Sequence, residues 1–222
     1  MHVTIVVADA SHEKYAQAIC DMIEEAAKHR GTGIAKRKPE YIREKIHKGN
    51  AVIALEGEKV VGFCYIESWQ GHKFVANSGL IVHPDYRKTG LAKQIKSKIF
   101  QLSRKKFPGS KIFGITTSLA VMKINSELGY KPVTFSELTS DETFWKGCES
   151  CKNYDILCRT ERKMCLCTGM VYDPAKEEKM KSAAGKQKNG SWEQFKKFLK
   201  TQKQRFPVKK ALYPKISKIL HP

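Results

Sequence analysis

The sequence predicts an α/β fold of the α+β kind, with a mixed, mostly antiparallel sheet of about six or seven strands flanked by helices. Three observations support this prediction. Strand-like and helix-like segments follow one another in the order βααβββαβαβ. Three strand-like segments are consecutive, and a loop containing glycine separates them from an amphipathic helix. The 222 residues are 41% hydrophobic, which is enough for one well-buried domain and an appendage.

The first part of the chain predicts one strand and two helices. Residues 3–8 form a β-branched run that is typical of a strand. Ser11 is a suitable N-cap for a helix that continues to about residue 28 with apolar residues along one face. Residues 30–37 contain two glycines and predict a loop, and Pro39 can open a second helix that ends near residue 46.

An antiparallel meander follows. Residues 51–55 and 60–69 are strand-like and are joined by a turn, and residues 74–82 predict a third strand. The next elements predicted are a helix from about residue 91 to 102, a strand at 111–116, a helix at 118–128 and a strand at 130–138.

The basic charge is concentrated at the C-terminal end. The formal net charge is +19, and residues 174–222 hold 14 Lys and Arg against three Glu. We expect residues 1–173 to form the folded domain, including a cysteine-rich segment at 145–172, and residues 174–222 to form a basic linker and an amphipathic helix. This helix would dock on the domain or on a second subunit, which leaves a homodimer open.

The composition also suggests where the protein resides and what it binds. No run approaches the roughly 18 apolar residues of a membrane span, and residues 1–9 do not have the layout of a signal peptide. We therefore expect a cytoplasmic protein without a membrane span. The positive charge suits a small anionic ligand, a nucleic acid or simple solubility and does not choose among them. We expect a small-molecule acceptor and no nucleic-acid partner.

The strongest functional signal is the loop Arg87-Lys88-Thr89-Gly90-Leu91-Ala92. Its small residues would let backbone N–H groups approach an anion, and the N-terminus of the following helix adds a positive dipole end. The two common nucleotide loops, Gly-x-x-x-x-Gly-Lys-Ser/Thr and Gly-x-Gly-x-x-Gly, do not fit this segment. The sequence therefore predicts a phosphate cradle of another type.

Val82-His83-Pro84, followed by the Arg-x-x-Gly-x-Ala loop, resembles the acyl-CoA site of the GCN5-related N-acetyltransferase (GNAT) superfamily. Leu128-Gly129-Tyr130 extends this resemblance, which covers about residues 1–138. It implies a sheet that splays between its fourth and fifth strands, and acetyl-CoA or succinyl-CoA as the donor. The residues that it implies for CoA binding are Leu80, Ile81, Val82, Arg87, Lys88, Thr89, Gly90, Leu91, Ala92, Ser118 and Asn125.

The usual acid and base of the superfamily are replaced in this chain. Asn125 takes the place of the tyrosine that commonly protonates the CoA thiolate, and an amide can only hydrogen-bond the sulfur. A thiol with a pKa near about 8.5 can leave as the thiolate. The fourth predicted strand contains no carboxylate. We predict that Glu67, or a water held by Asn77 and Ser78, accepts the proton of the amine. The alternative for Glu67 is a solvated charge at a strand end.

Four cations, Arg30, Lys36, Arg37 and Arg43, lie on the expected acceptor side and favour an acidic acceptor, although a plain basic surface is the alternative. Strings at residues 32–37, 144–148 and 163–170 resemble those of bacterial glutamate N-acyltransferases in arginine biosynthesis, which implies L-glutamate as acceptor. Two rival functions remain. One is acyl transfer to a protein, polyamine or drug amine, and the other is a catalytically decayed CoA-binding or nucleic-acid-binding regulator.

The cysteine-rich segment contains a possible metal site. Cys148, Cys151, Cys165 and Cys167 have the spacing of a zinc site, and the last two would face the same side if residues 163–172 form a strand. Cys158 would be left over. The alternatives are reduced cysteines packed as small apolar residues, a redox pair or an iron–sulfur cluster.

Overall fold

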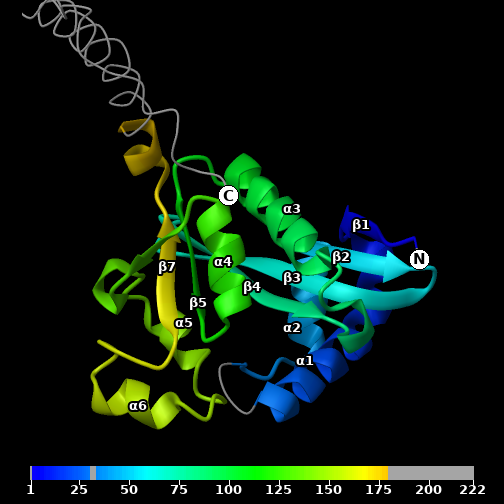
Figure 1. The fold of residues 1–222 in the computed structure, drawn as a ribbon, viewed down its shortest axis with the longest axis horizontal. Helices are drawn as coiled ribbons and strands as arrows, with labels where there is room; N and C mark the ends of the chain where they lie inside the picture. Colours follow the sequence, from blue (N-terminus) through cyan, green and yellow to red (C-terminus); the bar gives the residue numbers. More distant parts are fainter. Residues whose placement is uncertain (1, 31–33, 180–222) are drawn as a thin grey trace, which may run out of the picture. The chain divides into compact units, whose positions relative to one another are not determined.

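The sheet has seven strands in the order β1-β2-β3-β4-β5-β7-β6 (Figure 1). The computed structural model describes residues 2–30 and 34–179 and divides the chain into two compact units, residues 1–174 and 175–222. Strands β4 and β5 are parallel, and the other neighbours in the sheet are antiparallel. The strands are β1 (Thr4–Val7), β2 (Ala51–Glu56), β3 (Lys59–Trp69), β4 (Phe74–Val82), β5 (Lys111–Thr116), β6 (Lys131–Val133) and β7 (Thr168–Tyr172).

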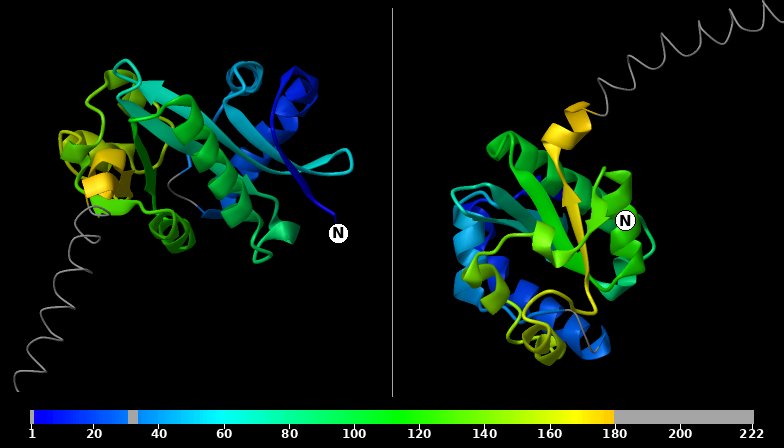
Figure 2. Two further views of the ribbon diagram at one scale, coloured as in Figure 1. Left: turned by 90° about the horizontal axis from the view of Figure 1, so that it is seen from above. Right: turned by 90° about the vertical axis from the view of Figure 1, so that its left-hand side faces the viewer.

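Helices cover both faces of the sheet (Figures 1 and 2). Because side chains alternate along a strand, Ile53 and Phe63 pack with α1 and α2, whereas Val52 and Cys64 pack with α3. The helices are η1 (Ala10–Tyr15), α1 (Ala16–Arg30), α2 (Pro39–His47), η2 (Pro84–Tyr86), α3 (Leu91–Lys106), α4 (Leu119–Glu127), η3 (Phe135–Glu137), α5 (Glu142–Lys146) and α6 (Tyr154–Arg159).

Two irregularities in β4 open the sheet. The strand pairs with β5 over three positions, and the last pair joins Ala76 to Phe113. Its register with β3 then shifts, so that Gly79 and Leu80 together lie opposite Cys64. A bulge of this kind bends a strand and redirects its backbone groups. The rest of β4 therefore runs away from β5 and leaves an opening between the two strands.

The predicted fold class is confirmed, and several boundaries differ. Asp9, and not Ser11, is the N-cap, because its carboxylate accepts the backbone N–H of Ser11 at 3.0 Å. The strand predicted at 130–138 stops at Val133, and it contains Pro132, which has no N–H to donate and so belongs at a sheet edge. The strand beside β5 is instead β7, from the cysteine-rich segment.

Two further sequence predictions concern the C-terminal helix and the expected absence of a membrane span. The predicted amphipathic helix near the C-terminus lies outside the described residues. Among the residues that are described, no helix has both the length and the apolar character needed to cross a membrane.

Candidate active site

A cavity of about 360 Å³ extends through the opening between β4 and β5. Its walls come from both sides of the sheet and from the cysteine-rich segment, which lies next to the loop after α1. That contact includes a hydrogen bond from the Lys36 backbone N–H to the Ser150 hydroxyl at 3.1 Å. We call the part near α1, α2 and β3 the acceptor end, and the part near β4, α3 and α4 the donor end. The two ends of the cavity are therefore formed by different helices and strands.

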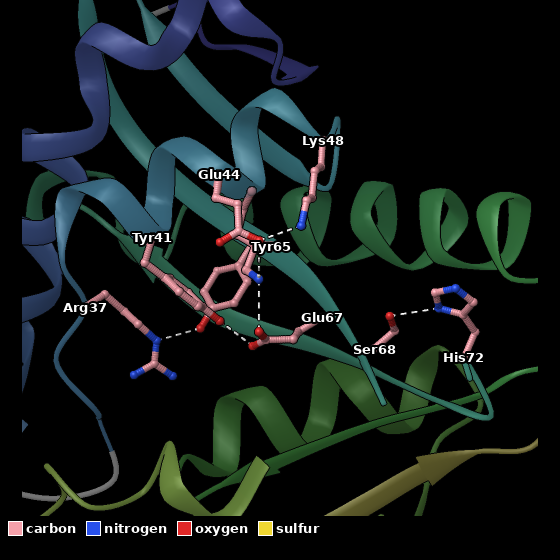
Figure 3. A network of polar contacts seen from close by, with 9 residues as sticks. Arg37, Tyr41, Glu44, Lys48, Tyr65, Glu67, Ser68 and His72 are labelled. Carbon is pink, nitrogen blue, oxygen red and sulfur yellow. Dashed lines mark hydrogen bonds and ion pairs between the residues drawn. The ribbon is translucent and has the colours of Figure 1, made fainter. Parts of the chain in front are cut away.

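Arg37 is the cation that the structure places at the acceptor end. Its Nε donates to the Tyr65 hydroxyl at 2.8 Å (Figure 3). One terminal nitrogen donates to the Lys36 carbonyl, also at 2.8 Å. The remaining guanidinium N–H groups have no hydrogen-bond partner among the described residues. A guanidinium that is held along one edge presents its other edge to a ligand, in the geometry that suits a carboxylate.

The other three predicted cations lie differently. The Lys36 side chain is exposed and its Nζ lies 3.6 Å from a carboxylate oxygen of Glu24, outside the cavity lining. Arg43 is exposed, pairs with Glu40 and does not line the cavity. Arg30 is the last residue of α1, and its side chain is outside the described part of the structure. Of the four cations predicted from sequence, the structure thus brings Arg37 to the cavity.

Glu67 also lies in the wall of the acceptor end, on the same face of β3 as Tyr65. Its carboxylate accepts hydrogen bonds from the Tyr41 hydroxyl and from Lys45 Nζ, the latter at 2.9 Å (Figure 3). Burial, followed by the neighbouring Tyr65 and Glu67, raises the pKa of Tyr41 far above its usual range. Tyr41 therefore stays a hydrogen-bond donor, and Glu67 is a positioned carboxylate.

The β4 bulge lines the donor end, and the loop that follows the strand lies beyond the cavity lining. Leu80 and Ile81 line the cavity, and Val82 pairs with β3. Gly90 is the N-cap of α3 with φ +85°, a left-handed conformation that glycine adopts without strain. The loop is closed by the Thr89 hydroxyl, which donates to the Tyr86 carbonyl at 2.7 Å. The first-turn N–H groups of α3 are thereby presented at the far end of β4.

The polar residues predicted around the reacting atoms occupy distinct places. Ser78 lines the cavity, but the Asn77 side chain is held by the Tyr130 hydroxyl at 3.0 Å and by its own bond to Ser103 at 2.6 Å. Asn125 lines the donor end and is buried, and its Oδ1 has no hydrogen-bond partner among the described residues. Ser118 caps α4 by accepting the N–H of Val121 and is not part of the cavity wall.

Sequence analysis missed four polar residues of the site: Tyr41, Tyr65 and Lys96 line the cavity, and Lys45 is the ion-pair partner of Glu67. Lys45 lies between Ile42 and Ile46 on the buried face of α2, and Lys96 lies beside Ile95 on the buried face of α3. A lysine among the apolar residues of an amphipathic helix is a signal that sequence can provide. Tyr41 lies next to Ile42 in an amphipathic helix and Tyr65 lies in the apolar part of β3, so nothing in the sequence separates them from core residues.

The four predicted metal ligands lie together around a small cavity of about 20 Å³ beside the acceptor end. Burial first, and then the neighbouring thiols, raise the pKa of Cys148 to about 11 and that of Cys167 to about 12. Both cysteines of the second pair precede β7 and so do not have the strand geometry that the sequence suggested. Within residues 2–30 and 34–179, no three His, Cys, Asp or Glu side chains are arranged to hold a metal ion. The structure therefore gives no support to the predicted zinc site.

Comparison with known proteins identifies the architecture. Residues 16–119 match the model of the acetyltransferase (GNAT) family. No curated protein matches the sequence of the whole chain.

Solved structures with a similar fold include N-acetylglutamate synthase from Neisseria gonorrhoeae complexed with coenzyme A and N-acetyl-glutamate, with a TM-score of 0.54 and 17% identity. That similarity covers 78% of this chain and 35% of the gonococcal chain. A Mycobacterium tuberculosis protein in complex with CoA has a TM-score of 0.54 and 15% identity, with 77% and 98% of the two chains covered. A phosphinothricin acetyltransferase from Sinorhizobium meliloti in complex with AcCoA has a TM-score of 0.51 and 15% identity, with 78% and 89% covered. At such identities the similarity establishes the fold alone.

Proposed function

Because residues 16–119 match the model of the acetyltransferase (GNAT) family, we propose that this chain transfers an acyl group from acyl-CoA to the α-amine of L-glutamate. The observation that carries this proposal is the cavity between β4 and β5, which has an anchored guanidinium at one end and a helix N-terminus beyond the other. Together these features suit a CoA ester on one side and an acidic amine on the other. The donor is acetyl-CoA or succinyl-CoA.

The donor would lie along the second half of β4. The first turn of α3 would bind the pyrophosphate, and backbone groups of Leu80, Ile81 and Val82 would bind the pantetheine arm. This places the thioester at the bulge, where a redirected backbone N–H can stabilise the negative charge that develops on the carbonyl oxygen. The unpartnered Asn125 Oδ1 would accept a hydrogen bond from the arm or from the thiol.

The acceptor would enter from the opposite end. One carboxylate of glutamate would pair with the open edge of the Arg37 guanidinium, which the bond to Tyr65 holds in place. This pairing fixes the α-amine near the thioester carbonyl carbon, and so converts the reaction into an attack within one complex.

The reaction removes two protons from the nitrogen of the α-ammonium. Glu67 accepts the first, directly or through a water near Ser78, and the neutral amine then attacks the carbonyl carbon. The nitrogen of the tetrahedral intermediate gives up the second proton to water, and the intermediate collapses when the C–S bond breaks and its electron pair stays on sulfur. The products are the N-acyl amino acid and CoA.

Thiol release tests the proposed function. Acetyl-CoA and succinyl-CoA are each incubated with the full chain, with and without L-glutamate, and free CoA thiol is measured over time. We expect release that depends on glutamate with at least one donor. Release with spermidine or a lysine peptide in place of glutamate would reassign the acceptor, and no release with any amine would leave the fold without the proposed activity.

Arg37→Met is expected to raise the KM for glutamate by about 100-fold, because a charge-assisted hydrogen-bonded pair contributes about 1.5–3 kcal/mol. The KM for acetyl-CoA is expected to stay within about twofold of wild type, since this residue lies at the acceptor end. Arg43→Met is the matched control, because Arg43 is exposed on α2 and pairs with Glu40 away from the cavity. Equal effects of the two variants would exclude Arg37 as the carboxylate anchor.

A further inference from the structure

We propose that the Lys96 ammonium is the cation that pairs with the CoA thiolate when the C–S bond breaks. This inference rests on the proposed acyl transfer and adds a catalytic residue to it. Lys96 extends from the buried face of α3 into the wall of the cavity, and 2% of the residue is exposed. It is therefore a charge that the fold places beside the reacting atoms and away from bulk water.

The surroundings of Lys96 supply polar contacts but no counter-ion. Its Nζ donates to the Asn77 carbonyl at 3.1 Å and lies 5.4 Å from the centre of the Tyr130 ring, a cation–π distance. No carboxylate of the described residues pairs with it. The titratable groups that face it are Cys64 from β3 and Tyr130 after α4, and burial raises the pKa of both, with Cys64 at about 11. Both neighbours therefore stay neutral.

A buried ammonium without a counter-ion is unfavourable, because burial removes the water that solvates the charge and no anionic group takes the place of that water. The same burial lowers the pKa of Lys96. An anion that arrives in the cavity would supply the missing interaction, and it would do so in surroundings where charges are weakly screened. This is the arrangement that stabilises a charge formed during a reaction rather than one already present.

The position of Lys96 selects the thiolate as this anion. Asn77, whose carbonyl it binds, lies directly after the last β4–β5 pair and two residues before the bulge that would hold the thioester. Tyr130, the other neighbour, donates its backbone N–H to the carbonyl of Asn125, which lines the same donor end. The sulfur would therefore leave into a space that Lys96 and Asn125 share. No other cation of the described residues lines this end of the cavity.

The charges balance without a proton donor. The C–S bond breaks, its electron pair goes to sulfur, and the resulting thiolate becomes the counter-ion of the ammonium. CoA takes a proton from solvent after release. This accounts for a site in which Asn125, which cannot donate a proton to sulfur, occupies the place expected for an acid.

Binding of CoA and of desulfo-CoA, which lacks the sulfur, tests the proposal in the full-length protein by calorimetry at about pH 8.5, where roughly half of a free thiol is ionised. We expect the wild type to bind CoA at least tenfold more tightly than desulfo-CoA, and Lys96→Met to lose this preference. Lys98→Met is the matched control, because Lys98 lies on the same helix and binds the Ile5 carbonyl outside the cavity. It should keep the preference.

A second measurement needs only the wild type and so does not depend on the folding of the variant. The ultraviolet absorbance of the thiolate is followed with pH for bound and free CoA, and we expect a pKa lower by about one unit or more in the bound state. An unchanged thiol pKa, or a CoA preference retained in Lys96→Met, would overturn the proposal. So would a Lys96→Met variant that loses activity with succinyl-CoA alone, because the ammonium would then serve the acyl carboxylate. Failure of the wild type to bind CoA at all would instead count against the proposed function.

Discussion

Glu67→Gln is expected to lower kcat by about 100-fold or more, because a positioned general base commonly contributes a factor of 10² to 10⁴. Glutamine keeps the size and hydrogen-bonding capacity of the side chain but cannot accept the proton of the α-ammonium. The KM for acetyl-CoA should change little, since the donor lies at the opposite end of the cavity. Steady-state kinetics with both substrates varied would measure this separation.

Glu67→Gln also removes an ion-pair partner of Lys45, so the control variant must weaken the ion pairing of the same lysine. This lysine is buried and pairs with Glu67 at 2.9 Å and with Glu44 at 3.8 Å, so removal of either carboxylate weakens an ion pair. Glu44 is exposed on α2 and does not line the cavity. Glu44→Gln should therefore leave kcat within about twofold of wild type. A comparable loss of kcat in both variants would show that the ion pair with Lys45, and not the proton acceptor, is what matters.

Gly79→Ala is expected to destabilise the protein by about 2 kcal/mol or more and to reduce activity with glutamate by at least tenfold. Gly79 has φ +64°, and a Cβ added there would lie 2.4 Å from Cε1 of the Tyr65 ring. The ring cannot move without releasing Arg37, whose Nε it holds. The substitution thus disturbs both the bulge at the donor end and the anchor at the acceptor end. Thermal unfolding and the KM for glutamate measure the two consequences.

Gly71→Ala separates backbone strain from this steric conflict. Gly71 also has a positive φ, +60°, but a Cβ added there meets no atom within 4 Å. We expect a loss of about 1 kcal/mol of stability from the left-handed conformation and no change in KM. If Gly79→Ala behaves like Gly71→Ala, the close packing of Tyr65 on the bulge is not required for the site.

The donor end could be predicted from sequence because its parts are adjacent in the chain. The loop from Arg87 to Ala92, the strand before it and the helix after it are one continuous segment, and small residues at fixed spacing are visible without a structure. The acceptor end could not be predicted in the same way. Arg37, Tyr65 and Cys148 come from three distant segments, and only their packing decides which of several nearby cations enters the cavity.

The position of the cysteine-rich segment in the fold also could not be predicted from its sequence. Its spacing predicted a metal site, and the four thiols line one small cavity, but the spacing did not indicate that the strand after them pairs with β5. β7 inserts between β5 and β6, so the segment closes the sheet and also forms the wall of the acceptor end. Strand pairing between residues more than 50 positions apart in the chain leaves no local pattern from which it could be inferred.

The sequence by itself determined the order of the main strands and helices and the glycine-containing loop between β4 and α3. These properties depend on the periodicity of apolar residues and on backbone conformations that neighbouring residues decide. Only the tertiary structure decided that Arg37 faces the cavity while Lys36 does not, that Glu67 is held by Tyr41 and Lys45, and that Lys96 lies buried without a counter-ion. Charge and burial at these positions arise from segments that meet through packing, and no stretch of the chain contains that information alone.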